Sequence, residues 1–289
     1  MKRTIINNSD ILKRGLVLLG ISPEAYAFSL DKDRATIYRY LNNESKIPYE
    51  VISNLLDLIY DRGINIVDVL GIDNENDYLY HATNKEIIFP INNHINDNKY
   101  NDFGHGFYLG ENLRQSSTWG KLGKSKMIYR FKKDKFKELK ILDFNSLKVI
   151  DWLNYIAVNR EKISFKEYPN IYRKYKKLES NYDMIKGKIG DSYSFEVLEM
   201  LYHDRIDIDQ AEYSTCMMAL GNQYCLKNDS FAKSLEADEV IIYDDILTKY
   251  FSHYSKVLQE KQNKNVELII NKVPNRHRVF SEYLKGKYE

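Results

Sequence analysis

The residues in this sequence that are best suited to chemistry surround one glycine-rich turn. Gly104 and Gly106 flank a single residue, so the backbone there can turn tightly and approach a ligand closely. A predicted strand then presents Tyr108, and a predicted helix presents Ser116 and Trp119 one turn apart. Rings stack on the faces of a flat heteroaromatic amide, and a serine hydroxyl can bond its carboxamide. Taken alone, such a pattern also occurs in strand-turn-helix units that only pack.

Two further segments carry polar side chains that are also suited to chemistry. The first is Leu79-Tyr80-His81-Ala82-Thr83, a predicted strand that bears a histidine near its end. The second is Leu220-Gly221-Asn222-Gln223-Tyr224, which follows much later in the sequence. The order of the three segments is therefore histidine strand, glycine turn and glutamine segment.

In this order the segments resemble the ADP-ribosyltransferase superfamily, in its diphtheria-toxin and poly(ADP-ribose) polymerase branch. His81-Ala82-Thr83 resembles the His-Gly-Ser/Thr motif, whose histidine holds a ribose of NAD⁺ and whose glycine backbone holds the carboxamide. Gly104-His105-Gly106-Phe107-Tyr108 resembles the Gly-Lys-Gly-Ile-Tyr motif, whose tyrosine stacks on nicotinamide. Trp119 stands eleven residues beyond Tyr108, where the polymerases carry a second stacking tyrosine, and Ser116 matches their serine three residues before it.

The resemblance implies a set of residues that bind NAD⁺ as a co-substrate: His81, Ala82, Thr83, Gly106, Tyr108, Ser116 and Trp119. It implies His81, Tyr108 and Gln223 as catalytic residues and implies no metal. Two positions depart from the motifs. Ala82 replaces a glycine of which only the backbone is used, and Gln223 aligns with the catalytic glutamate. Glutamine keeps the hydrogen bond to the ribose 2′-OH but loses the charge that stabilises the transition state, which argues against polymer formation.

Within this superfamily the sequence resembles the bacterial DUF3990 proteins. They share a Leu-Tyr-His-Gly-Thr start and an Asp-Phe-Gly-Lys-Gly-Phe-Tyr-Leu motif, which Asp102-Phe103-Gly104-His105-Gly106-Phe107-Tyr108-Leu109 resembles. They also carry an Asn-x-Gln in the third motif, so Gln223 is compatible with activity. A Tyr-Asp-hydrophobic-Ile-Gly stretch in them is similar to residues 182–187. The resemblance covers roughly residues 78–226.

The region before these motifs, residues 1–70, is expected to form short helices. Leu12, Leu16 and Leu19 form one apolar stripe, Gly20 ends that helix, and Ser22-Pro23 begins the next. Asp33 can cap a third helix over 34–41, and a fourth begins near Pro48. This succession resembles the five-helix domain of phage-repressor-like helix-turn-helix proteins.

In that family the third helix enters the major groove of DNA, which implies Arg34, Thr36 and Arg39 as the DNA-contacting residues. Residues 1–70 hold nine basic and nine acidic side chains, so this region is neutral. Because phosphate contacts dominate DNA affinity, docking of a partner protein such as an antitoxin, or dimerisation, remains the alternative.

The order of elements predicts an α+β chain. We expect an all-α helix-turn-helix domain at 1–72 and an ADP-ribosyltransferase-type split β-sandwich with flanking helices at 77–245, followed by a helical extension at 246–289. The acidic stretch 73–77 is expected to be a linker. Strands are predicted around Tyr78–Tyr80, Phe107–Leu109 and Met127–Phe131, and helices over Asp151–Asn159 and Phe195–Tyr202.

Composition excludes several classes of protein. No apolar run approaches the roughly 20 residues of a membrane span, and the first residues turn polar too early for a secretory signal. Two cysteines, Cys216 and Cys225, cannot form a disulfide framework or a four-ligand zinc site by themselves. Residues 121–140 hold nine basic and two acidic side chains. This basic stretch is either a solvated face or a platform that binds a diphosphate or a nucleic acid. A cytoplasmic protein is expected.

The resemblance therefore implies an NAD-dependent mono-ADP-ribosyltransferase, and by analogy the setting of a bacterial or phage toxin, toxin–antitoxin or defence system. Its acceptor would be a macromolecule, protein or nucleic acid. Two alternatives remain open. One is an NAD hydrolase, with water as the acceptor. The other is a transcriptional regulator without catalysis, whose second domain senses a nucleotide.

Overall fold

The computed structural model describes residues 1–73, 75–93, 101–119, 126–189, 192–216, 221–254, 256–257 and 271–287. The chain divides into two compact units. Unit 1 comprises Met1–Glu86, Asn112–Lys133 and Ala237–Tyr254, and unit 2 comprises Ile87–Glu111, Asp134–Glu236 and Ser255–Glu289. Both units are therefore built from segments that are far apart in the sequence, whereas the predicted domain boundaries follow contiguous regions.

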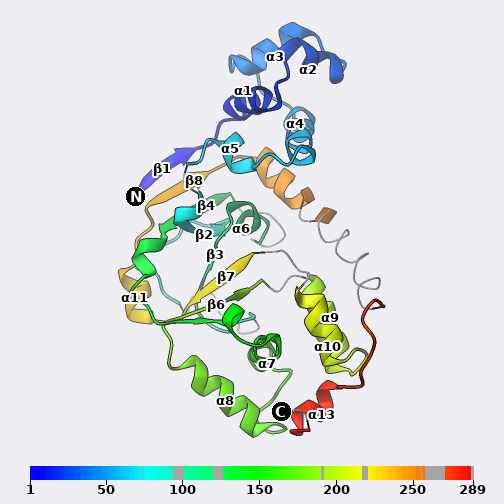
Figure 1. The fold of residues 1–289 in the computed structure, drawn as a ribbon. Helices are drawn as coiled ribbons and strands as arrows, with labels where there is room; N and C mark the ends of the chain where they lie inside the picture. The colour runs from blue at the N-terminus through cyan, green and yellow to red at the C-terminus, as the bar shows by residue number, and fades with distance from the viewer. Residues whose placement is uncertain are drawn as a thin grey trace. The chain divides into compact units, whose positions relative to one another are not determined.

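Unit 1 contains the five short helices near the start of the chain (Figure 1). They are α1 (Asn8–Leu19), α2 (Pro23–Ser29), α3 (Arg34–Leu41), α4 (Tyr49–Asp61) and α5 (Ile66–Leu70). The predicted caps are confirmed: Ser22 and Asp33 accept backbone N–H groups of α2 and α3, and Gly20 ends α1 at a φ of 64°. α1 packs against α3, α4 and α5, and α2 packs against α3. Local capping signals thus delimit these helices as the sequence predicts.

Among its described residues, unit 1 also contains four strands in the order β1-β8-β4-β2. Their bounds are β1 (Lys2–Ile5), β8 (Glu239–Ile242), β4 (Met127–Lys132) and β2 (Tyr78–Thr83). β1 runs parallel to β8, and the other two pairs are antiparallel. The expectation of helices throughout 1–70 is wrong for β1. The β-branched residues Thr4 and Ile5 favour a strand, and the pairing partner that fixes it lies in a late part of the sequence.

The segment expected to be a linker makes several contacts in unit 1. It includes a 3₁₀ helix, η1 (Glu75–Asp77), and its residue 74 lies outside the described residues. The Tyr80 hydroxyl donates to the Glu75 carbonyl at 2.9 Å. The Glu75 carboxylate accepts the Leu113 N–H at 3.2 Å, at the start of α6 (Leu113–Trp119). Unit 1 ends with a helix over residues 245–254.

The part of unit 2 that the structure describes contains four strands in the order β3-β7-β6-β5. They are β3 (Phe107–Gly110), β7 (Asn222–Leu226), β6 (Met184–Lys188) and β5 (Ile141–Asp143). β3, β7 and β6 are antiparallel neighbours, and β5 runs parallel to β6. The described helices of this unit are α7 (Val149–Asn159), α8 (Pro169–Glu179), α9 (Ser192–Tyr202), α10 (Ile208–Cys216), α11 (Asp229–Ser234) and α13 (Phe280–Leu284), with a 3₁₀ helix at Phe144–Ser146. Another 3₁₀ helix, Lys133–Phe136, begins at the last residue of a unit 1 segment. The predicted strands β2, β3 and β4 and the predicted helices α7 and α9 are confirmed.

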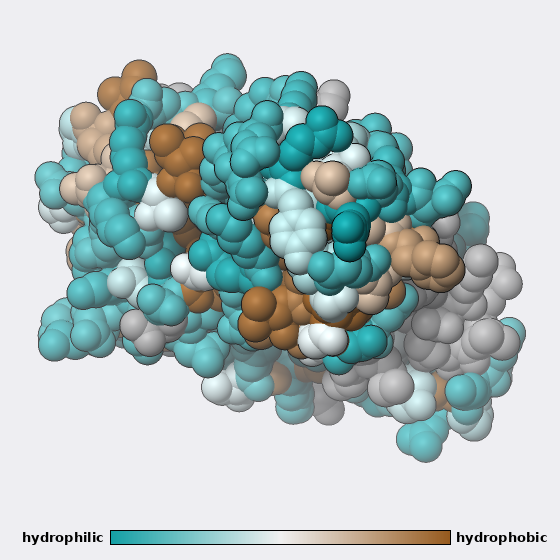
Figure 2. Space-filling view, turned by 90° about the horizontal axis from the view of Figure 1, so that it is seen from above, coloured by the Kyte–Doolittle hydropathy of each residue, from teal (hydrophilic) through white to brown (hydrophobic). Residues whose placement is uncertain are grey.

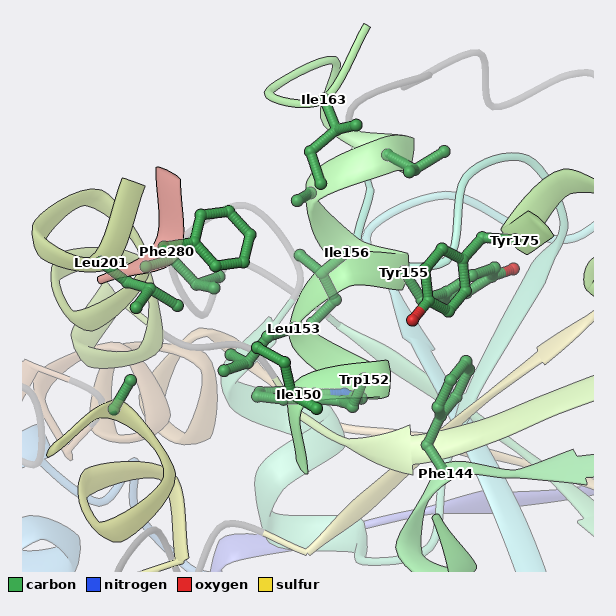
Figure 3. Packing of buried hydrophobic residues seen from close by; sticks show 14 of the residues in the cluster. Phe144, Ile150, Trp152, Leu153, Tyr155, Ile156, Ile163, Tyr175, Leu201 and Phe280 are labelled. Atoms are coloured by element: carbon green, nitrogen blue, oxygen red, sulfur yellow. The ribbon is translucent and has the colours of Figure 1, made fainter. Parts of the chain in front are cut away.

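The core of unit 2 is centred on α7. Figure 3 shows this helix in the middle of the cluster, with Leu201 and Phe280 on one side and Phe144 and Tyr175 on the other. The rings of Phe144 and Tyr155 are tilted against each other, with centroids 4.8 Å apart. One fully buried ring of this core, Phe103, belongs to the glycine turn singled out in the sequence.

The surface shown in Figure 2 is mainly hydrophilic, with apolar groups gathered in places. In α1 and α2 the exposed large apolar side chains are Val17, Leu18 and Phe28. Across the part of the chain that the structure describes, every helix is too short or too polar to cross a lipid bilayer.

Candidate functional site

Strand pairing in unit 2 brings two of the predicted motifs together. Tyr108 of β3 lies opposite Cys225 of β7, and Gly110 lies opposite Gln223. Because paired residues of a sheet share a face and alternate residues along a strand return to it, Tyr108 and Gln223 lie on the same face. On the other side of β7, Gln223 pairs with Gly187 of β6. Gln223 therefore stands between two glycines and next to the predicted stacking tyrosine.

The glycine turn before β3 is anchored by aromatic rings. Gly104 has a φ of 68° and Gly106 a φ of 150°, both in the region that favours glycine. Phe103, fully buried, stacks with Tyr108 at a centroid distance of 6.4 Å and contacts Tyr155 at 5.9 Å. The turn is thus held onto the core of unit 2.

The hydroxyl of Tyr108 also folds back onto the turn. It donates to the Gly104 carbonyl at 2.7 Å and accepts the Phe103 N–H at 3.0 Å. Burial, with the Cys225 thiol and the Asp102 carboxylate nearby, raises the pKa of Tyr108 well above its ordinary value. The hydroxyl therefore stays protonated and acts as a structural donor to the turn.

A lysine fixes the outer side of the same turn. Lys227 donates to the carbonyl of His105 at 2.7 Å and to that of Phe103, and it pairs with Glu179 at 2.9 Å. Burial alone would raise the pKa of Glu179, but Lys227 and Lys176 together lower it below its ordinary value. A cavity of about 330 Å³ adjoins the turn here, and His105, Lys227 and Glu179 are among its lining residues. Sequence reasoning assigned no role to Lys227 or Glu179, since neither is close to the turn in sequence.

Gln223 is buried, with 4 % of its surface exposed, and its amide is held by polar partners. Its Nε2 donates to Asp102 Oδ2 at 2.8 Å and to the Lys188 carbonyl at 3.2 Å. The other oxygen of Asp102 pairs with the guanidinium of Arg160, and both side chains are at least nine-tenths buried. Sequence reasoning quoted Asp102 within the second motif but gave it no role. Its position immediately before the turn was the available signal.

The remaining predicted residues of the site lie in unit 1. His81, Ala82 and Thr83 are half-buried on β2, where His81 lies opposite Tyr129 of β4. Ser116 is buried in α6, which packs against β2, and its hydroxyl donates to the Asn112 carbonyl at 2.9 Å. Trp119 is the last residue of α6, and its side chain lies outside the described residues.

Each unit therefore gathers part of the predicted residue set. Unit 2 brings together Gly106, Tyr108 and Gln223 around one turn, and unit 1 brings His81 and Ser116 onto neighbouring elements. Among the residues that the structure describes, no group of three or more His, Cys, Asp and Glu side chains could hold a metal ion. Burial raises the pKa of the Cys225 thiol to about 11, so this cysteine is not an activated nucleophile.

The residues implied for DNA contact lie on α3. Arg34 and Arg39 are exposed, whereas Thr36 is half-buried and accepts a hydrogen bond from the Arg39 guanidinium at 3.2 Å. Ile37 and Tyr40 of the same helix are buried. α3 thus presents its basic residues to solvent and its apolar residues to the helical core.

Comparison with protein-family models matches residues 78–237 to DUF3990, described as a protein of unknown function. The match covers more than half of the chain, so the chain belongs to this family. It begins at the first residue of β2 and includes the glycine turn, β7 and α11. Comparisons with curated proteins and with solved structures found no match. The DUF3990 part of the sequence prediction is therefore confirmed.

Proposed function

We propose that this chain is an NAD-dependent mono-ADP-ribosyltransferase. The observation that carries the proposal is the pairing of β3 with β7, which places Tyr108 and Gln223 on one face of one sheet. The resemblance implies that the stacking tyrosine and the third motif both contact NAD⁺, and this pairing brings them together although they are far apart in the sequence. As part of this proposal we assign the ADP-ribosyltransferase-type split β-sandwich to residues 77–245.

In the proposed reaction the chain binds NAD⁺ through the residues that the resemblance implies. Tyr108 and Trp119 would stack on nicotinamide, Ser116 and the backbone of Ala82 and Thr83 would hold its carboxamide, and His81 would hold a ribose. The bond between C1′ of the ribose and the ring nitrogen breaks, and nicotinamide leaves with the electron pair. A nucleophilic atom of the acceptor then bonds to C1′ and loses its proton to solvent. Gln223 would accept a hydrogen bond from the ribose 2′-OH during this step.

The glutamine limits the chemistry that this site supports. A neutral amide does not deprotonate an acceptor hydroxyl, so repeated transfer onto a growing polymer is not expected. A single transfer needs only that the acceptor be nucleophilic at neutral pH. We therefore propose one ADP-ribose per acceptor site, on a protein or a nucleic acid, as a toxin or defence effector would use it.

We further propose that α1–α5 form a helix-turn-helix domain with α3 as its recognition helix. The exposed positions of Arg34 and Arg39 support this assignment, because both can reach phosphates or base edges. The neutral charge of residues 1–70 supports the other possible use of the same helices, docking of an antitoxin or other partner protein.

The test is incubation of the full chain with NAD⁺ labelled in its adenylate half, with and without cell lysate. We expect nicotinamide release and label on macromolecules. Tyr108→Ala should lower release by roughly 100-fold because the stacking ring is lost, and His81→Ala should lower it similarly. Tyr108→Phe, which keeps the ring and removes only the hydroxyl, should lose much less. Tyr213→Ala, at a 40 % exposed position, is the matched control.

Three results would contradict the proposal in different ways. Free ADP-ribose without labelled macromolecules would indicate an NAD hydrolase. Specific operator binding without nicotinamide release would indicate a nucleotide-sensing regulator. Failure of the folded chain to bind NAD⁺ in calorimetry would reject the site itself.

A further inference from the structure

The carboxylate of Asp102 fixes which way the Gln223 amide points. An ionised carboxylate can only accept hydrogen bonds, so the Gln223 atom at 2.8 Å from Oδ2 must be the NH₂ nitrogen. The second contact of that nitrogen, the Lys188 carbonyl at 3.2 Å, is also acceptor-only. Two acceptors therefore select the same orientation of the amide, and its Oε1 is directed away from both.

Asp102 is itself held so that it cannot turn away. The Arg160 guanidinium binds its other carboxylate oxygen, and the Asn159 side chain donates to its backbone carbonyl at 3.3 Å. Asp102 is 6 % exposed, and its neighbour Phe103 is fully buried in the core of unit 2. The carboxylate is thus a rigid anchor rather than a solvated side chain.

The hydrogen bond between Gln223 and Asp102 also places the negative charge of the carboxylate next to the nitrogen of the amide. A hydrogen bond from Nε2 to an ionised acceptor polarises the amide and increases the electron density on Oε1. A glutamate at this position would carry its charge on the acceptor oxygen itself. Here the carboxylate belongs instead to Asp102, the residue that precedes the glycine turn, and a hydrogen bond connects it to the amide nitrogen of Gln223.

We infer that Asp102 is the positioning residue of the glutamine in this site: it presents Gln223 Oε1 as a polarised acceptor and supplies the carboxylate that position 223 lacks. This inference rests on the proposed function, in which Oε1 meets the ribose 2′-OH. It explains how a glutamine can stand where a glutamate is expected without removing the carboxylate from the site.

Moving the carboxylate from one residue to the other tests the inference. Asp102→Asn presents an NH₂ group to Gln223, so the amide must turn and direct its own NH₂ outward. We expect kcat for nicotinamide release to fall roughly 100-fold, with KM changed less than about threefold. In Asp102→Asn/Gln223→Glu the Asn amide donates to the new glutamate and can still accept from Arg160. This double variant should recover at least tenfold of the lost rate.

Two controls separate positioning from folding. Asp207→Asn alters another buried carboxylate of unit 2, which accepts the Gln210 N–H at 2.9 Å and is fully buried. It should lower stability while leaving kcat per folded molecule within about twofold of the wild type. Gln223→Glu alone places two carboxylates at hydrogen-bond distance, so one must hold a proton, and its rate should lie below that of the double variant.

The inference is overturned if Asp102→Asn keeps kcat within threefold, or if the double variant is no faster than Asp102→Asn. If the wild type releases no nicotinamide, the proposed function fails by that result alone. In that case the hydrogen bond between Asp102 and Gln223 is tested by the effect of the two substitutions on the stability of the folded chain. The Asp102 and Gln223 substitutions should show at least a fivefold coupling in the unfolding equilibrium constant, and additive effects would reject the contact.

Discussion

Replacing Gly106 with alanine tests the turn on which the site is built. An added Cβ would lie 2.6 Å from the Leu226 carbonyl oxygen and against the Cys225 thiol, and neither partner is the end of a flexible chain. The φ of 150° adds backbone strain of about 1–3 kcal/mol. Overpacking adds a similar amount. We therefore expect Gly106→Ala to lower the free energy of unfolding of unit 2 by about 4 kcal/mol.

The assay is urea unfolding followed by the fluorescence of Trp152, which lies in the core of unit 2. The chain has two tryptophans, so a Trp119→Phe background isolates this signal. Gly286→Ala is the matched control in the same unit. Its φ is 84°, and among the described residues no atom beyond its chain neighbours lies within 4 Å of the added Cβ, so it should lose only about 1–2 kcal/mol.

A second substitution separates the two clashes. Adding Cys225→Ala to Gly106→Ala removes the thiol but leaves the Leu226 carbonyl, so part of the lost stability should return. Equal losses for Gly106→Ala and Gly286→Ala would refute the close approach. A double variant with the summed loss of its parts would refute the contact with the thiol.

Three further predictions follow from the described contacts. Lys227 depresses the pKa of Glu179, so the stability from this carboxylate is present above its ordinary pKa of about 4.3 and is lost as pH falls through the depressed value. Glu179→Gln should therefore reduce the fall in the free energy of unfolding at acid pH, measured by urea denaturation at a series of pH values, and an unchanged fall would contradict the pairing. Arg130→Met leaves the Glu239 carboxylate buried without its guanidinium and should cost about 3 kcal/mol in urea unfolding, where a loss below about 1 kcal/mol would be inconsistent with a buried pair. Arg39→Ala should reduce the salt slope of duplex DNA binding by about one, measured by fluorescence anisotropy, and an unchanged slope would argue for partner docking instead.

The sequence predicts the elements whose signals are local. Asp33 caps α3 and Gly20 ends α1 because each acts on a backbone within a few residues. β1 is not predicted, because its four mostly exposed residues become a strand only through pairing with β8. The motifs that indicated DUF3990 are likewise local, and they lie within the residues that the family model matches.

The polar network of the site is less accessible to sequence reasoning. The motifs name Tyr108 and Gln223, but the partner that orients Gln223 depends on how the turn folds back over β7. Asp102 and Arg160 are far apart in the sequence, and nothing local indicates that their side chains meet. Buried ion pairs of this kind become visible only when strand register and helix placement are known.

The pairing of β1 with β8 has a consequence for synthesis on the ribosome. β8 lies between β1 and β4 in the sheet of unit 1, and it is translated long after both of them. Until residue 242 leaves the exit tunnel, β1 and the facing edge of β4 lack their hydrogen-bonding partner. The sheet of unit 1 therefore closes late, and chains that end before β8 should expose two unpaired strand edges and aggregate.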